Sequence, residues 1–235
     1  KTQNAGLDWQ QIPYNFSPIS NVSIQSIHFP SVDIGYLEFR GDNGGLNSYL
    51  YKTSDGGQNW VDKTPLNLPV GTGLADVYFI DDNNGFVLSG EAIFKTTDGG
   101  NNWMQTTFPG FSGLTEVDFY DLNNGILGAW DGTFAYRGMV YSTTDGGLNW
   151  DSLILQSNYT HISDVDYVQN NTAFALNVGG WQVTQKIYKT INNGVTWDTL
   201  SLNLTNDDVA LDMKFTNENE GFISTQNGEI HSTTD

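Results

Sequence analysis

Short runs in which apolar and polar residues alternate recur along this chain, and most lead into a turn rich in asparagine, aspartate and glycine. The clearest is DVYF at residues 76–79, with related runs at residues 116–119, 164–167 and 212–215 and a version without an acid at residues 26–29. Alternation with a period of two places the apolar side chains on one face of a strand, and Asn, Asp and Gly tolerate the positive φ of tight turns. The pattern therefore predicts many short β-strands.

A ten-residue phrase with the core pattern Thr-x-Asp-x-Gly-x-x-Trp returns through the chain, at residues 51–60, 94–103, 141–150 and 188–197. Its tryptophans recur after 43, 47 and 47 residues, which is the length of a four-stranded propeller blade. We expect each phrase to form the turn between the third and fourth strands of a blade. The side chains expected to shape this turn are Thr53, Asp55, Gly57, Trp60, Thr96, Asp98, Gly100, Trp103, Thr143, Asp145, Gly147, Trp150, Thr190, Asn192, Gly194 and Trp197.

Incomplete copies of the phrase stand at both ends. Thr2, Asn4, Gly6 and Trp9 keep its spacing, and residues 233–235 repeat its beginning. We expect one all-β domain over residues 1–235, a β-propeller with five four-stranded antiparallel blades in this chain. The two end copies would overlap at one turn if they closed a ring, which favours a larger propeller of about seven blades, with a closed five-bladed ring as the alternative. The repeats are expected at approximately residues 10–60, 61–103, 104–150, 151–197 and 198–235.

These phrases resemble the Asp-box, or BNR, repeats of sialidases, xyloglucanases, sortilin-type receptors and the photosystem II assembly factor. The resemblance spans essentially the whole chain. It is closest to the assembly-factor type, which also occurs in exported bacterial proteins. The resemblance implies a propeller whose boxes lie at the blade periphery and serve folding, so Asp55, Asp98 and Asp145 are expected to be structural.

The net charge of the chain limits the kinds of partner that it can bind. The chain has 9 basic and 27 acidic residues, a formal net charge of −18, and no basic stripe that would neutralise phosphates. Nucleic acid and anionic membrane surfaces are therefore poor partners, and the basic docking patch that the assembly-factor resemblance implies is missing. No apolar run reaches the roughly 20 residues of a membrane span. We expect an extracellular, cell-surface or periplasmic bacterial protein whose signal peptide lies outside this chain.

The sequence does not indicate catalysis. The resemblance to sialidases implies that such an activity needs three arginines around the substrate carboxylate. This chain has two arginines, Arg40 and Arg137. It also lacks a nucleophile elbow, a phosphate-binding loop and a zinc-type histidine pair. Two alternatives stay open. One is a glycoside hydrolase of the xyloglucanase type that uses paired carboxylates, and the other is an assembly factor that docks on a membrane complex.

The connections between the second and third strands, and those between blades, are irregular in sequence and are expected to share one face of the propeller. Aromatic rings beside polar residues on such a face suit stacking and directional hydrogen bonds with a polysaccharide or a surface protein. We expect a non-catalytic binding propeller whose ligand-binding residues include Trp130, Phe134, Tyr136, Arg137 and Trp181.

Four acids occupy equivalent positions on the innermost strands: Asp76, Glu116, Asp164 and Asp212. A ring of carboxylates is able to bind Ca²⁺, which prefers oxygen ligands. The favoured interpretation is that each acid instead bonds the backbone of a neighbouring blade, and no cofactor is expected.

Overall fold

The computed structural model describes residues 1–2, 4, 6–12, 16, 19–42, 46–68, 73–108, 111–132, 136–156, 159–179, 185–202, 204 and 208–234. Within them, nineteen strands form five antiparallel sheets. In the same part of the chain, no helix is long and apolar enough to cross a membrane.

Each sheet is one blade. Blade one contains β1 (Ser20–His28), β2 (Gly35–Asp42), β3 (Leu46–Thr53) and β4 (Val61–Asp62). Blade two contains β5 (Asp76–Phe79), β6 (Gly85–Ser89), β7 (Ala92–Thr96) and β8 (Met104–Thr107). Blade three contains β9 (Phe111–Phe119), β10 (Gly125–Asp131), β11 (Gly138–Thr143) and β12 (Asp151–Gln156). Blade four contains β13 (Thr160–Gln169), β14 (Thr172–Gly179), β15 (Lys186–Thr190) and β16 (Asp198–Ser201). Blade five contains β17 (Ala210–Phe215), β18 (Gly221–Thr225) and β19 (Ile230–Thr233).

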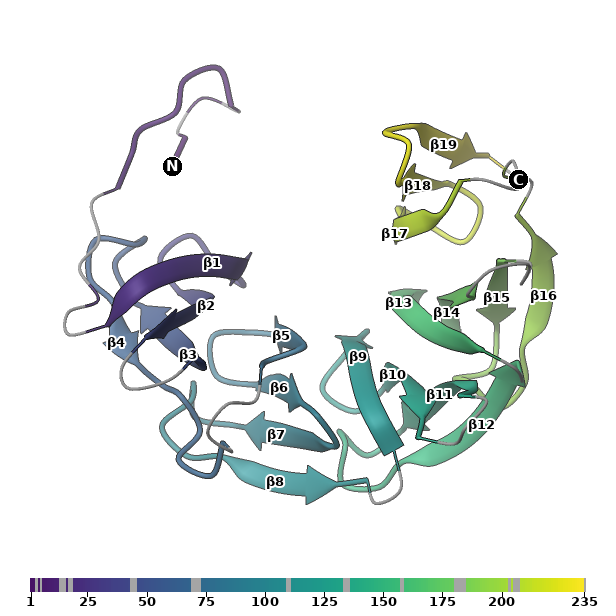
Figure 1. Cartoon of the computed structure of the whole chain (residues 1–235), viewed down its shortest axis with the longest axis horizontal. Coiled ribbons are helices and arrows are strands. Elements are labelled where there is room, and N and C mark those ends of the chain that lie inside the picture. Colours follow the sequence, from purple (N-terminus) through teal and green to yellow (C-terminus); the bar gives the residue numbers. More distant parts are fainter. Residues whose placement is uncertain are drawn as a thin grey trace.

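Consecutive strands are neighbours in every sheet, so each blade is an antiparallel meander with strands a to d running outward. Figure 1 shows the blades along an open arc, with strand a innermost and with the N-terminal segment and β19 on the two sides of the gap. This confirms the predicted all-β propeller of antiparallel blades. A closed five-bladed ring is not the arrangement seen here, and the total blade number stays a prediction.

The Asp-box phrase forms the c–d turn, as predicted. In blade three the Thr143 hydroxyl donates to Asp145 Oδ1 at 2.9 Å and accepts from the Gly147 amide at 2.9 Å. Asp145 Oδ1 also accepts from the Asn149 amide at 2.9 Å. Hydrogen bonds, above all from the Asn149 side chain, lower the pKa of Asp145 to about 2. The turn is therefore stabilised above about pH 4 and loses this contribution as the pH falls toward about 2.

The box of blade four shows that the side-chain Oδ1 atom is the acceptor that the turn needs. Asn192 replaces the acid, and its Oδ1 still accepts from the Thr190 hydroxyl and from the Thr196 amide, both at 2.9 Å. We therefore predict that Thr143→Val, which leaves the buried Gly147 amide without its acceptor, lowers the free energy of unfolding by about 1–3 kcal/mol. The double variant Asp145→Asn, Asn149→Thr, which reproduces the pair Asn192 and Thr196 of blade four, is the control and should lose less stability. Equal losses in the two variants, measured by urea unfolding, would contradict this account of the turn.

Blades are joined by aromatic stacking. In blades one and two the second residue of strand b lies flat against the last residue of strand a in the following blade, for example Tyr36 against Phe79 with centroids 3.3 Å apart and ring planes 7° apart. Phe86 stacks in the same way on Phe119 at 4.2 Å. In blade three Ile126 takes this position and packs with Tyr167. The residue before the stacked ring is glycine because a Cβ on Gly85 would lie 2.3 Å from the Phe79 ring. The Gly-aromatic pair thus serves the joint between blades.

Two further side chains complete a joint. The box tryptophan of the following blade meets the strand-a ring edge-on, as Trp103 meets Phe79 at 6.3 Å and 78°. A strand-c lysine covers the stacked ring and reaches across, since Lys52 Nζ lies 5.2 Å from the Tyr36 ring and donates to the Asp82 carbonyl at 3.1 Å. The hydrophobic core is therefore divided into clusters that lie between blades.

Candidate functional site

The two ends of the blades present different surfaces. The a–b and c–d turns meet at one end, where the Gly99 amide donates to the Asn83 carbonyl at 2.9 Å, and we call this end the turn face. At the other end the Phe108 amide donates to the Glu91 carbonyl at 2.8 Å, which joins a d–a connection to a b–c turn. We call this end the loop face. The structure confirms that the irregular connections share one face.

Three aromatic residues gather on the loop face of blade three, and we call them the rim cluster: Trp130, Tyr136 and Tyr159. Trp130 lies at the end of β10, and its ring centroid is 5.8 Å from that of Tyr136. Tyr159 lies between blades three and four, and its centroid is 5.6 Å from that of Tyr136. Both contacts are edge-on, with interplanar angles of 69° and 88°. The cluster leaves ring surface open to solvent.

An ion pair braces the same loop. Arg137 Nε and Nη2 each lie 2.5 Å from Asp131 Oδ2, and the Arg137 amide donates to Asp131 Oδ1 at 2.9 Å. Asp131 is buried, while Arg137 is partly exposed. Arg137 therefore fixes the ends of the b–c loop beside the rim cluster, and its charge is already paired.

The predicted ligand-binding residues are thus brought together in part. Trp130, Tyr136 and Arg137 lie in one loop region, whereas Phe134 and Trp181 lie outside the described residues. The sequence did not indicate Asp131 as the partner of Arg137. Asp131 could have been found from its position at the end of a strand, six residues before Arg137.

The acids of strand a connect blades to one another. Asp76 Oδ2 accepts from the Val117 amide of blade three at 3.0 Å, and Asp164 Oδ2 accepts from the Met213 amide of blade five. Burial and the nearby charge of Asp164 raise the pKa of Glu116. These contacts agree with the favoured interpretation for Asp76 and Asp164.

The Asp164 carboxyl contacts those of Glu116 and Asp212, but in the described part of the chain these acids do not bring three ligand atoms within 4.8 Å of one another. There, the group of three acid or histidine side chains with ligand atoms within 4.8 Å of one another is a different set, Asp208, Glu229 and His231. Asp208 Oδ1 accepts from the Val209 amide at 3.0 Å and from the Asn227 amide at 3.2 Å. The Asp208 carboxylate therefore already stabilises a turn, and calcium binding by Asp76, Glu116, Asp164 and Asp212 stays an untested alternative to the favoured interpretation.

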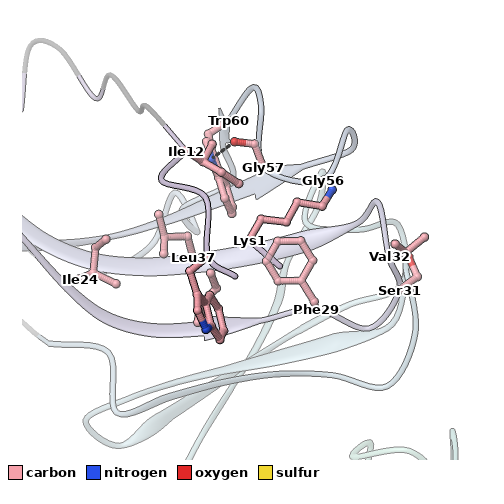
Figure 2. Close-up of a pocket in the computed structure, with 12 residues that line it drawn as sticks. Lys1, Ile12, Ile24, Phe29, Ser31, Val32, Leu37, Gly56, Gly57 and Trp60 are labelled. Carbon is pink, nitrogen blue, oxygen red and sulfur yellow. Dashed lines mark hydrogen bonds between the residues drawn. The ribbon is translucent and has the colours of Figure 1, made fainter. Parts of the chain in front are cut away.

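An apolar hollow of about 460 Å³ lies on the open side of blade one (Figure 2). Phe29 and Trp60 meet there at 6.3 Å and 86°, the geometry of Phe79 and Trp103 within a complete joint. Lys1 Nζ reaches the place beside Gly56 that Lys52 Nζ occupies beside Gly99. The hollow therefore has the arrangement of half an inter-blade joint in which no ring among the described residues stacks flat on Phe29, and we do not assign a small ligand to it.

Comparison with known families matches residues 63–200, more than half of the chain, to the family described as photosynthesis system II assembly factor YCF48. The chain belongs to this family. The match confirms the resemblance drawn from the Asp-box phrases. No curated protein matches the chain.

Solved structures show the same fold. A structure titled "YCF48 bound to D1 peptide" is 18% identical, with a TM-score of 0.52, and the match covers 96% of this chain and 84% of that one. The GH74 xyloglucanase from Xanthomonas campestris is 12% identical, with a TM-score of 0.63, and the match covers 85% of this chain but 35% of the enzyme. At these identities both comparisons support the propeller fold alone.

Proposed function

We propose that this family member is a non-catalytic propeller that binds a peptide segment of a protein partner on its loop face, at the rim cluster. The observation that carries the proposal is the group of open aromatic edges at Trp130, Tyr136 and Tyr159, beside a loop that Arg137 and Asp131 brace. Rigid aromatic side chains lose little conformational freedom on binding and offer large contact areas.

Charge suggests the chemistry of the bound segment. The net charge of −18 favours association with a basic segment and disfavours an acidic one. Apolar or aromatic side chains of that segment would contact the rim cluster. The 18% identical relative supports a peptide as the class of ligand, because its structure was solved with a peptide bound.

Several contacts support a role without catalysis. The carboxylates of Asp76, Asp118 and Asp164 each accept a backbone amide from another blade. Carboxylates used in this way hold the scaffold together and are not poised as an acid and nucleophile pair across a cleft. The xyloglucanase-type alternative is therefore the less supported one.

The test is a peptide-display screen on the purified chain, followed by measurement of dissociation constants for selected peptides. We predict that basic, aromatic peptides are selected and that a Tyr136→Ala, Tyr159→Ala double variant weakens their binding about 10- to 100-fold, or about 1.4–3 kcal/mol. Tyr120→Ala is the matched control, because Tyr120 is 45% exposed, as Tyr159 is at 44%, but lies in an a–b turn on the turn face.

A glycan array and a polysaccharide-hydrolysis assay on the same sample form the second arm. Glycan binding that the double variant loses would keep the site but change the class of ligand to a polysaccharide, which the sequence suggests beside a surface protein. Release of oligosaccharide would overturn the non-catalytic proposal. Peptide binding that is unchanged in the double variant would overturn the placement at the rim cluster.

A further inference from the structure

Three side chains that are able to bind a metal ion meet on the loop face of blade five. Asp208 lies in the d–a connection before β17, Glu229 ends the b–c turn, and His231 lies on β19. One oxygen of each carboxylate and one ring nitrogen of His231 lie within 4.8 Å of one another. His231 Nε2 is 3.2 Å from Glu229 Oε2. Two ligand atoms of a tetrahedral zinc ion, each about 2.0–2.1 Å from it, are about 3.3–3.4 Å apart, so this pair already has a suitable spacing.

Blade five departs from the repeat at two of these positions. Strand pairing aligns His231 with buried aromatic residues of the core in other blades, namely Phe94, Tyr141 and Tyr188. Glu229 lies two residues earlier, at the position of Ala92, Met139 and Lys186 in those blades. The blade scaffold therefore does not require an acid and an imidazole at these positions, and the pair is available for another role.

Asp208 is a buried carboxylate, 2% exposed, that bonds through one oxygen. Its Oδ1 accepts from the amides of Val209 and Asn227, at 3.0 and 3.2 Å. Its main-chain carbonyl accepts from Gln185 Nε2 at 2.7 Å, which fixes the residue in place. Its Oδ2 has no hydrogen-bond partner in the part of the chain that the structure describes. Burial of a carboxylate is costly unless its charge is compensated, and a cation bound at Oδ2 would supply that compensation.

The turn before β19 positions the other two ligands. The Thr225 amide donates to the Glu229 carbonyl at 3.0 Å and closes the hairpin. Glu229 and His231 are two residues apart along the extended chain, which places their side chains on the same side. The Gln226 amide donates to the Val209 carbonyl at 2.8 Å, so the hairpin is bonded to the d–a connection beside Asp208. The backbone therefore holds all three ligands in one place.

We propose that Asp208, Glu229 and His231 bind a Zn²⁺ ion, with water at the remaining position of a tetrahedral site. Carboxylate oxygens and an imidazole nitrogen are ligands that zinc accepts, and the two carboxylates balance its charge. Oxygen ligands alone would suit Ca²⁺, whereas the imidazole favours a transition metal. Bound zinc ties the b–c turn of blade five to the connection from blade four. The site is separate from the rim cluster and does not rest on the proposed peptide binding.

The test is a titration of zinc chloride into the purified full chain by isothermal titration calorimetry, where we expect saturable binding. Asp208→Asn, which keeps the Oδ1 acceptor for the two amides, and His231→Gln should each weaken binding at least about tenfold. Glu218→Gln is the matched control and should bind as the wild type does, because Glu218 is an exposed acid of the same blade in its a–b turn. The absence of saturable binding, or binding that either ligand variant leaves unchanged, would overturn the proposal.

Nuclear magnetic resonance of the histidine rings locates the ion, because the chain has three histidines. Zinc should shift the ring nitrogen resonances of His231 and leave those of His28 and His161 in place. Calcium chloride is the comparison and should bind at least about tenfold more weakly. Shifts confined to the other two histidines, or equal affinity for the two ions, would overturn the assignment. The Tyr136→Ala, Tyr159→Ala variant should bind zinc as the wild type does, so failure of this site and failure of peptide binding are distinguishable.

Discussion

Phe79→Ala is expected to lower the free energy of unfolding by about 3–5 kcal/mol, whereas Phe29→Ala is expected to cost about 1–2 kcal/mol. The two residues occupy the same position at the end of strand a. Phe79 is 2% exposed because it stacks on Tyr36 of the preceding blade, while Phe29 is 40% exposed and no ring among the described residues stacks flat on it. The difference between the two variants therefore measures how much stacking between blades contributes to the free energy of unfolding.

Urea unfolding of both variants at one pH provides the measurement. Phe215→Ala serves as a third point, since Phe215 stacks on Phe174 and should behave like Phe79. Similar losses at Phe79 and Phe29 would show that the contacts within a blade dominate, and would contradict the joint described here.

The second large effect is a dependence of stability on pH that comes from Glu38. This side chain is 3% exposed on β2, and its Oε1 has no hydrogen-bond partner. Burial raises the pKa of Glu38 to about 7, against the opposing influence of nearby Arg40. The folded protein therefore keeps a proton that the unfolded chain releases above its ordinary pKa, so this group lowers stability as the pH rises from about 4 toward 7.

We expect Glu38→Gln to remain close to wild-type stability at about pH 4 and to be more stable than the wild type by about 3 kcal/mol at pH 8. The amide keeps the shape of the side chain and removes the buried charge. Unfolding by urea across this pH range tests the prediction. A stability difference that does not change with pH would show that folding leaves the pKa of Glu38 unchanged, and would contradict this account.

Most of the fold could be predicted because the residues that specify it act locally. Thr143, Asp145 and Gly147 bond within one turn, so their spacing alone identifies the turn. The alternating run at residues 76–79 similarly indicates the innermost strand. The stacking of Tyr36 on Phe79 could not be predicted, because it joins residues more than forty positions apart in different blades.

The candidate site was harder to predict than the fold. Trp130 and Tyr136 could be selected because they are aromatic residues in an irregular loop. The contact of Tyr136 with Tyr159 could not be predicted, because it depends on how two neighbouring blades meet. The burial of Glu38 was also hard to predict, because an alternating pattern places every second residue of a strand in solvent. Residues 35–39 are buried on both faces, and an acid in such a strand marks an electrostatic cost.

Hydrogen exchange on the chain with a selected peptide bound tests the central claim most directly. The account predicts new protection on the loop face, in β11 just after Tyr136 and in β13 just after Tyr159, together with loss of this protection in the double variant. Protection confined to the turn face, or unchanged in the double variant, would contradict peptide binding at the rim cluster.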